Sequence, residues 1–176
     1  MKIVAIIVLA CLGLLAWRVS SAESVPQVGS PAPDFELPDT HGQVQRLTEF
    51  QGKWLVLYFY PKNDTPGCTK EACHFRDDLV QLEKLGARVV GVSVDDTASH
   101  AEFAKKYNLP FPLLADADGK VADRYGALIN LGIVKWAKRY TFLIAPDGKI
   151  AKTYLSVDTS KHSQEIIDDL KRLTAG

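Results

Sequence analysis

The fold is organised around the run Trp54-Leu55-Val56-Leu57-Tyr58-Phe59-Tyr60, an unbroken stretch of aromatic and branched apolar residues. Such a run is typical of a β-strand that is covered on both faces. Pro61 ends it, and apolar residues then recur at helical spacing from Ala72 to Leu85. The sequence therefore predicts a central strand, a loop and an amphipathic helix that ends near Gly86.

Strands and helices alternate along the rest of the chain. Helical spacing predicts two more helices, one at 98–107 and a last one that follows Ser160 or Ser163 and has apolar positions up to Leu173. Pro146-Asp147-Gly148 is a turn signature for an antiparallel hairpin. This order predicts an α/β domain with a mixed central sheet and helices on both faces. The further strands are predicted at 88–94, 111–115, 140–145 and 150–157.

Three regions give weaker signals. Residues 35–47 predict a short hairpin at the edge of the domain. Ser160 or Ser163 is the expected N-cap of the last helix, because serine hydroxyls accept from the free backbone N–H groups there. The stretch 127–138 has no clear periodicity, and we expect a loop.

Composition indicates one compact domain, since 47% of the 176 residues are hydrophobic and 24% are charged. Lysine plus arginine balance aspartate plus glutamate at 21 each, and the charges are interspersed. No basic stripe is available for a phosphate backbone, which argues against nucleic acid as a partner. Three cysteines are too few for a disulfide-stapled scaffold. No haem, flavin or nucleotide motif occurs, so no cofactor is expected.

The N-terminus has the pattern of an export signal. Lys2 precedes an apolar run at 3–17, and the small residues at 20–22 suit cleavage after Ala22. Arg18 lies between the run and that site, which is unusual for a cleaved signal and leaves room for an uncleaved anchor that starts in the cytoplasm. Cleavage and anchoring both stay open. Either one makes the domain an exported one, periplasmic or anchored facing the periplasm.

The chain is thus expected to have three parts: a signal peptide or N-terminal membrane anchor at 1–22, a linker at 23–27 and the folded domain at 28–176. Cys11 lies in a context that loosely resembles a lipoprotein processing site. Because the apolar run continues beyond it, an apolar filler is favoured over lipidation.

The chemistry is expected in residues 60–73, which read Tyr-Pro-Lys-Asn-Asp-Thr-Pro-Gly-Cys-Thr-Lys-Glu-Ala-Cys. Cys68 falls in the first turn of the predicted helix, just beyond a strand. The first N–H groups of a helix lack partners and its dipole is positive there, so a thiolate is stabilised. Thr65 can supply a hydroxyl, and Pro61 and Pro66 stiffen the loop without offering an N–H. A reactive thiolate also needs a donor beside it for the charge that develops on the group it attacks, and an arginine is expected to supply it.

The spacing of Pro61, Thr65 and Cys68 resembles the signature of peroxiredoxins. Cys73, five residues after Cys68, makes the segment similar to the bacterioferritin comigratory protein (Bcp) or PrxQ subfamily. The resemblance covers most of Val28 to Leu173, including Ala32-Pro33-Asp34-Phe35 and Phe142-Leu143-Ile144.

This resemblance implies a thioredoxin-like fold and a thiol peroxidase that acts on hydrogen peroxide and organic hydroperoxides. Cys68 would be the peroxidatic cysteine, Pro61 and Thr65 would belong to its pocket, and Cys73 would be the resolving cysteine. The resulting disulfide would be reduced by thioredoxin or a similar dithiol protein.

The resemblance also assigns the active-site arginine to Arg139, just before the strand predicted at 140–145. The fixed fork of guanidinium donors suits an oxyanion. Lys138 and Arg124 stay open as alternatives.

The two cysteines cannot be joined while both lie on one helix. Five residues separate their directions by about 140° and place their Cα atoms roughly 8 to 9 Å apart. A disulfide needs Cα atoms within about 7 Å. We therefore expect the first helical turn to unwind after Cys68 becomes a sulfenic acid. Resolution within one chain requires no dimer, so we expect a monomer.

Three other functions fit parts of the pattern. Metal binding by Cys68, Cys73 and His74 is disfavoured, because zinc pairs are usually two to four residues apart and no second cluster exists. An exported disulfide reductase would carry Cys-x-x-Cys, whereas four residues separate these cysteines. A peroxide sensor would use the same oxidation and stays open. The other histidines occur in turns or at helix starts, where solvated side chains are expected: His41, His100 and His162.

Overall fold

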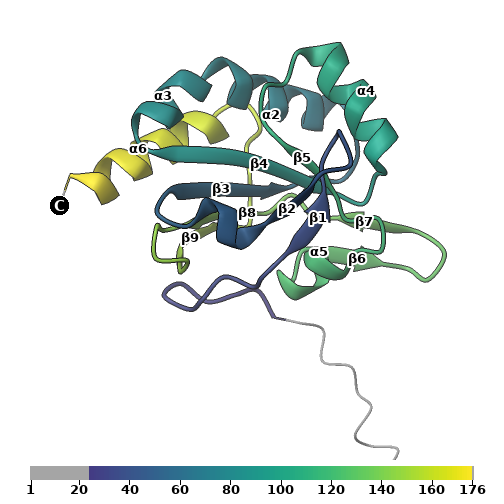
Figure 1. Cartoon of the computed structure of the whole chain (residues 1–176), viewed down its shortest axis with the longest axis horizontal. Helices are drawn as coiled ribbons and strands as arrows, with labels where there is room; N and C mark the ends of the chain where they lie inside the picture. Colours follow the sequence, from purple (N-terminus) through teal and green to yellow (C-terminus); the bar gives the residue numbers. More distant parts are fainter. Residues whose placement is uncertain (1–23, 176) are drawn as a thin grey trace, which may run out of the picture.

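The computed structural model describes residues 24–175. Its core is a five-stranded mixed sheet with the order β5-β4-β3-β8-β9, in which β3, β4 and β5 are parallel and β8 and β9 are antiparallel (Figure 1). The predicted central strand, β3, is at its centre. The strands are β3 (Trp54–Phe59), β4 (Ala87–Ser93), β5 (Leu113–Ala115), β8 (Thr141–Ile144) and β9 (Ile150–Tyr154).

Helices cover both faces of the sheet, as predicted. One face carries the helices α2 (Pro66–Asp77), α3 (Leu79–Lys84), α4 (Thr97–Tyr107) and α6 (His162–Thr174). The other face is covered by α5 (Lys120–Arg124) and by smaller elements (Figure 1). These are the hairpin of β1 (Glu36–Pro38) and β2 (Val44–Arg46), the short helix η2 (Leu47–Phe50), and the hairpin of β6 (Leu128–Asn130) and β7 (Lys135–Ala137).

The side chains of β3 alternate between two apolar cores. Val56 and Tyr58 pack with the helices α2, α4 and α6, whereas Leu55, Leu57 and Phe59 pack against the opposite layer. All five are almost completely buried. Each such side chain contributes about 1.5 to 3 kcal/mol by leaving water, which explains why this strand has no polar position.

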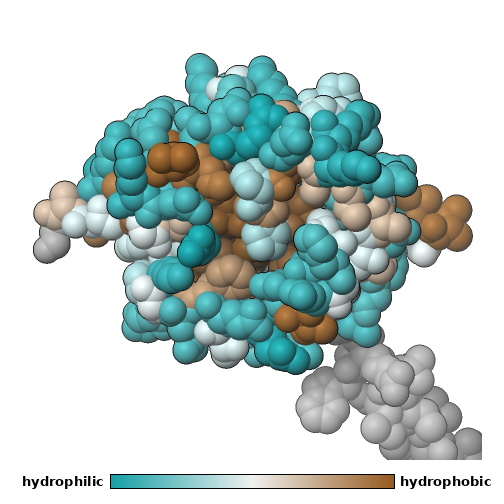
Figure 2. Space-filling model, turned by 45° about the horizontal axis from the view of Figure 1, so that its top comes forward, coloured by the Kyte–Doolittle hydropathy of each residue, from teal (hydrophilic) through white to brown (hydrophobic). Residues whose placement is uncertain are grey.

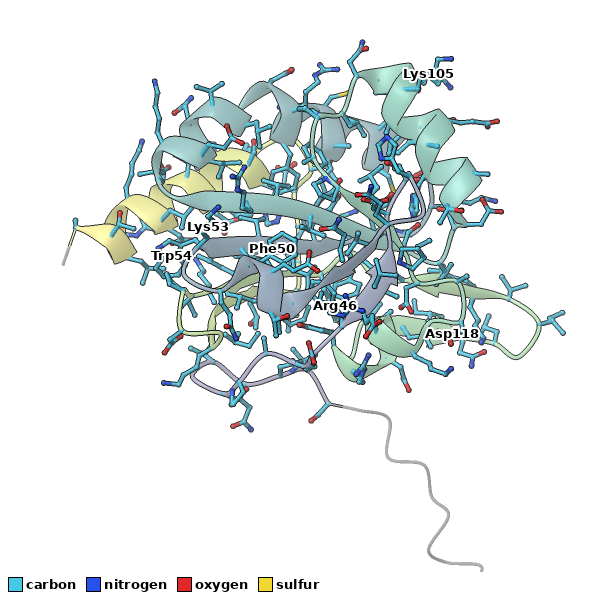
Figure 3. The ribbon with its side chains drawn as sticks, viewed as in Figure 1. Arg46, Phe50, Lys53, Trp54, Lys105 and Asp118 are labelled. Carbon is cyan, nitrogen blue, oxygen red and sulfur yellow. The ribbon has the colours of Figure 1, made fainter. Side chains whose placement is uncertain are left out.

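The carboxyl ends of the parallel strands define one edge of the sheet. Lys53 and Trp54 lie at the amino end of β3 (Figure 3). The loop that follows Phe59 therefore starts at the opposite edge, and it leads directly into α2. This places the segment with Cys68 at the carboxyl edge, where ligands of open α/β sheets usually bind.

The helix predicted up to Gly86 is in fact two helices, because α2 ends at Asp77 and α3 starts at Leu79. Between them Asp78 has φ −94° and ψ 1°, and its carboxylate accepts a hydrogen bond from Ser163 Oγ at 2.6 Å. The helix is thus interrupted at the residue that forms a hydrogen bond to α6. The prediction that Ser160 or Ser163 caps α6 is also wrong, since Lys161 is the N-cap residue.

The loop expected at 127–138 is instead the β6–β7 hairpin. Gly132 has φ 85° in its turn, and its N–H donates to Asn130 Oδ1 at 2.9 Å. Three-residue strands produce too short a pattern to be seen in the sequence. By contrast, the hairpins predicted at 35–47 and around Pro146-Asp147-Gly148 are confirmed as β1–β2 and β8–β9.

Between Ser24 and Ala175, no helix is long and apolar enough to cross a bilayer. The signal peptide or anchor predicted at 1–22, the start of the linker and Cys11 lie outside the described residues.

Candidate active site

Cys68 is the third residue of α2, as its position after the strand predicts. Thr65 is the N-cap residue, with extended backbone angles of φ −83° and ψ 146°, and Pro66 occupies the first helical position. Proline suits this position, because its ring fixes a helical φ and the N–H that it lacks would have no partner there. The thiol of Cys68 is buried, with a relative exposure of 1% for the residue.

Arg139 reaches Cys68 because β8 runs antiparallel to β3. The N–H of Phe59 donates to the carbonyl of Tyr140 at 2.8 Å, which places the start of β8 beside the end of β3. Arg139 Nη2 then lies 3.2 Å from Cys68 Sγ and donates to it. Gly67 leaves room for this contact, since a Cβ on Gly67 would lie 3.2 Å from the same nitrogen.

The two alternatives to Arg139 are placed elsewhere. Lys138 Nζ donates to the carbonyl of Gly126 at 3.0 Å. Arg124 is an exposed residue at the end of α5. Of these three cations, Arg139 is therefore the one in contact with the thiol.

Glu71 is a site residue that the sequence interpretation missed. Its side chain is 1% exposed, and its Oε2 accepts a hydrogen bond from Arg139 Nη1. The guanidinium fork thus joins the carboxylate to the thiol of Cys68, and it is held in one orientation. The spacing carried a signal for this residue, because positions three apart share a helix face and Glu71 follows Cys68 by three.

Burial raises the pKa of Glu71 from 4.5 to about 7, and the neighbouring Arg139 opposes part of that shift. Near neutral pH the carboxyl group of Glu71 is therefore present in both its protonated and its ionised form. Ionised Glu71 shares the positive charge of Arg139 with the sulfur of Cys68, and protonated Glu71 leaves more of that charge to the sulfur.

The pKa of Glu71 predicts a pH effect on stability. A carboxyl whose pKa is raised by folding binds more protons in the folded state, so its contribution to the free energy of unfolding falls as pH rises from about 4.5 to about 7. In Glu71→Gln this fall is expected to disappear, a difference on the order of 1 to 3 kcal/mol. Urea unfolding at pH 5, 6, 7 and 8 measures it, with Glu83→Gln, an exposed surface residue, as the control. Equal pH slopes in the parent and Glu71→Gln would contradict the assignment.

The structure places the remaining predicted pocket residues around the loop before α2. Thr65 Oγ1 donates to the carbonyl of Lys62 at 3.1 Å, so this hydrogen bond holds the loop before α2 together. Pro61 is half-buried at the end of β3. Cys73 is half-buried further along α2, and both Cys68 and Cys73 are free thiols.

A buried polar network fixes this loop to α4. The Tyr60 hydroxyl donates to Asn63 Oδ1 at 2.8 Å, and Asn63 Nδ2 donates to Ser99 Oγ at 2.9 Å and lies 3.1 Å from His100 Nδ1. The backbone N–H of Asn63 donates to Asp95 Oδ2 at 2.8 Å. Through Asn63, the loop that carries Thr65 is bonded to a helix distant in sequence.

The prediction that His100 and His162 are solvated is wrong, because both are buried. His100 Nε2 donates to the carbonyl of Leu114 at 3.1 Å, which leaves Nδ1 as the acceptor facing Asn63. Burial lowers the pKa of His100, so the ring is neutral. His162 Nε2 lies 2.8 Å from Thr141 Oγ1. These partners are far away in sequence.

Asn63→Ala is expected to lower the free energy of unfolding by about 2 kcal/mol, because the buried partners of Asn63 lose their hydrogen bonds. It should also slow the reaction of Cys68 with peroxide by about tenfold or more, since the loop is no longer held in register. Urea unfolding and stopped-flow oxidation measure the two effects. Asn63→Asp keeps the acceptor for Tyr60 but removes the donor to Ser99, so it tests that half of the network alone. A destabilised Asn63→Ala that still reacts at the parent rate would show that the network has no part in positioning the loop.

Among the residues that the structure describes, no three histidine, cysteine, aspartate or glutamate side chains gather as metal ligands do. The group that contacts the Cys68 thiol is the guanidinium of Arg139, which is not a metal ligand.

The chain is similar to known proteins over most of its length. The profile of the AhpC/TSA family matches residues 28–153. Peroxiredoxin Bcp of Bacillus subtilis is 40% identical over 152 residues, which are 84% of this chain and 97% of that protein.

Solved structures show the same fold. The peroxidoxin BcpB of Mycobacterium tuberculosis has a TM-score of 0.80 at 37% identity and covers 84% of this chain and 98% of its own. The bacterioferritin comigratory protein of Xanthomonas campestris has a TM-score of 0.76 at 32% identity and covers 86% and 99%. That protein was solved in a study of its alkyl peroxide reduction activity, with trapped intermediate and ligand complexes.

Proposed function

The chain belongs to the AhpC/TSA family as a peroxiredoxin of the Bcp/PrxQ type, a thiol peroxidase with a thioredoxin-like fold, and from this premise we propose a two-cysteine mechanism for it. Cys68 reduces hydrogen peroxide and organic hydroperoxides, and Cys73 resolves the oxidised Cys68 within the same chain. The observation that carries the proposal is the 3.2 Å contact of Arg139 Nη2 with Cys68 Sγ.

In the first step the thiolate of Cys68 attacks the terminal oxygen of the peroxide. The S–O bond forms as the O–O bond breaks, so that sulfur is oxidised to a sulfenic acid and the distal oxygen leaves as water or an alcohol after taking a proton. Arg139 is already aimed at the sulfur, and its fork can stabilise the charge that develops on the leaving oxygen. Glu71 keeps the guanidinium in that orientation.

In the second step Cys73 attacks the sulfur of the sulfenic acid, and hydroxide leaves as water. Both cysteines lie in α2, five residues apart. Because helical geometry holds their Cα atoms roughly 8 to 9 Å apart, the segment between them must unwind before the disulfide closes. Glu71 lies in this segment, so unwinding also breaks its contact with Arg139.

A dithiol protein of the thioredoxin type then reduces the disulfide by thiol exchange and returns both cysteines to thiols. Reduction of organic hydroperoxides is supported by the alkyl peroxide activity of the Xanthomonas campestris relative. No cofactor is needed, since the chemistry uses sulfur and positioned donors alone. Resolution within one chain supports a monomer as the working unit.

We also propose that the domain works outside the cytoplasm, tethered through the apolar run at 3–17. Arg18, between this run and the possible cleavage site after Ala22, supports an uncleaved anchor over a cleaved signal. The reductant would then be a thioredoxin-like protein on the same side of the membrane.

The test of the peroxidase assignment is consumption of hydrogen peroxide by the full chain with a thioredoxin system. The parent is expected to turn over, and Cys68→Ser is expected to be inactive while it keeps the fold, as measured by circular dichroism. A Cys68→Ser variant that still consumes peroxide would overturn the assignment. A parent that reduces protein disulfides but leaves peroxide intact would make the chain a reductase.

A further inference from the structure

The β6–β7 hairpin exposes apolar side chains at its tip, residues 131–134. Leu131 is 68% exposed, Ile133 99% and Val134 50%. With Gly132 they form an uncharged stretch of four residues, and Figure 2 shows apolar surface protruding at the right-hand end, where Figure 1 places the hairpin. Soluble domains rarely gather exposed apolar side chains at one point unless they contact a partner or a membrane.

The base of the hairpin carries residue types that are common at bilayer interfaces. Trp136 is half-buried on β7, between Lys135 and Lys138. The Lys135 ammonium donates to the carbonyl of Asp118 at 3.1 Å, and Asp118 lies beside the hairpin in Figure 3. Tryptophan and lysine combine an apolar body with a polar end, which suits the headgroup region. The hairpin thus has an apolar tip above an amphipathic base.

The hairpin lies on the same face of the sheet as the first described residues. The Tyr125 hydroxyl donates to the carbonyl of Pro33 at 2.6 Å, which joins the end of α5 to the N-terminal segment. Ala127 and Ala137, at the base of the hairpin, share one apolar core with Phe35. Figure 1 shows both segments below the sheet.

The N-terminal apolar run is close to the domain along the chain. Only residues 18–23 separate Trp17 from Ser24, and a fully extended chain of this length spans roughly 25 Å. A domain anchored through residues 3–17 is therefore held near the bilayer surface, and the local concentration of lipid at the hairpin tip is high.

We propose that the hairpin tip enters the surface of the bilayer that holds the N-terminal anchor. This inference rests on the proposed anchor and is independent of the proposed peroxide chemistry. A convex apolar tip can enter a bilayer without a matching concave surface. A stable protein interface, by contrast, needs a matching surface and buries about 1,200 to 2,000 Å² in total. Four tip residues cannot supply such an interface, so a second copy is the poorer occupant. Two attachments also fix the orientation of the domain, which a single flexible tether does not.

The test uses the full chain in vesicles of equal parts phosphatidylcholine and phosphatidylglycerol. An environment-sensitive dye is attached to Ile133→Cys in a chain whose native cysteines are replaced by serine. Val80→Cys is the matched control, because Val80 is 62% exposed and lies on α3, on the opposite face of the sheet. Brominated lipids serve as the quencher.

The dye at position 133 is expected to shift its emission to the blue and to be quenched by brominated lipids, whereas the dye at position 80 should emit as in water. A chain that floats with the vesicles while the dye at 133 stays aqueous would keep the anchor and overturn the hairpin contact. A blue shift without lipid quenching, rising with protein density, would assign the tip to a second copy instead. A chain that does not float would overturn both.

A second measurement keeps all cysteines and so does not depend on the labelled variants folding. In a Trp17→Phe, Trp54→Phe chain, Trp136 is the single tryptophan. Its fluorescence is expected to be quenched by brominated lipids, and Ile133→Asp should abolish the quenching while peroxide consumption in the same vesicles stays unchanged. Equal quenching with and without Ile133→Asp would contradict insertion of the tip.

Discussion

Replacing Arg139 by methionine is expected to slow the reaction of Cys68 with hydrogen peroxide by about 100- to 1,000-fold, the loss typical of removing one preorganised donor from an oxyanion site. Arg139 Nη2 contacts Cys68 Sγ at 3.2 Å, so methionine removes both the charge beside the thiolate and the donor for the leaving oxygen. The fold should survive, because Glu71 is left as a buried carboxyl that can take up a proton.

Stopped-flow oxidation of the reduced chain measures this rate directly, separately from the reductant. Arg124→Met is the matched control, since Arg124 is exposed at the end of α5 and should react at the parent rate. Arg139→Lys keeps the charge without the fork and should recover only part of the loss. A rate for Arg139→Met within about twofold of the parent, or a comparable loss in Arg124→Met, would remove Arg139 from the mechanism.

Cys73→Ser is expected to abolish turnover with thioredoxin, by about 100-fold or more, while a single oxidation of Cys68 proceeds at the parent rate. Cys73 lies five residues after Cys68 on α2 and both thiols are free, so its loss leaves the first step intact. Without the resolving thiol, the sulfenic acid persists and further peroxide oxidises it to sulfinic acid.

Two readouts separate the steps in Cys73→Ser. Rapid mixing with one equivalent of peroxide measures the first oxidation, and peroxide consumption with thioredoxin and its reductase measures turnover. Mass spectrometry after excess peroxide should find sulfinic acid at Cys68. Full turnover of Cys73→Ser would mean that the reductant attacks the sulfenic acid directly, and Cys73 would then have no catalytic part.

The central strand and the segment after it could be predicted because their signals are local. The apolar run at 54–60 excludes polar positions on either face, and Pro61 and Pro66 mark the ends of a loop. Cys68 follows in the first turn of a helix, as that pattern requires. Arg139 could be placed through the resemblance to peroxiredoxins, since it stands just before the segment 140–144, where the family has its active-site arginine.

The features that were missed depend on contacts between segments that are distant in sequence. The helix break at Asp78 follows from Ser163 on α6, and helical periodicity alone does not reveal such a contact. His100 is buried because Leu114 and Asn63 satisfy both ring nitrogens. Glu71 is a partial exception. Its helical spacing from Cys68 can be read from the sequence, but its contact with the distant Arg139 cannot.

The measurement that tests the account most directly is disulfide mapping of the full reduced chain after one equivalent of hydrogen peroxide. Peptides from a non-reducing digest, which also report on Cys11, identify the oxidised residues by mass. The account predicts one disulfide between Cys68 and Cys73 of the same chain, closed at a rate that follows the local unwinding of α2. Free thiols at both positions after the peroxide is consumed, or a disulfide between two chains, would contradict it.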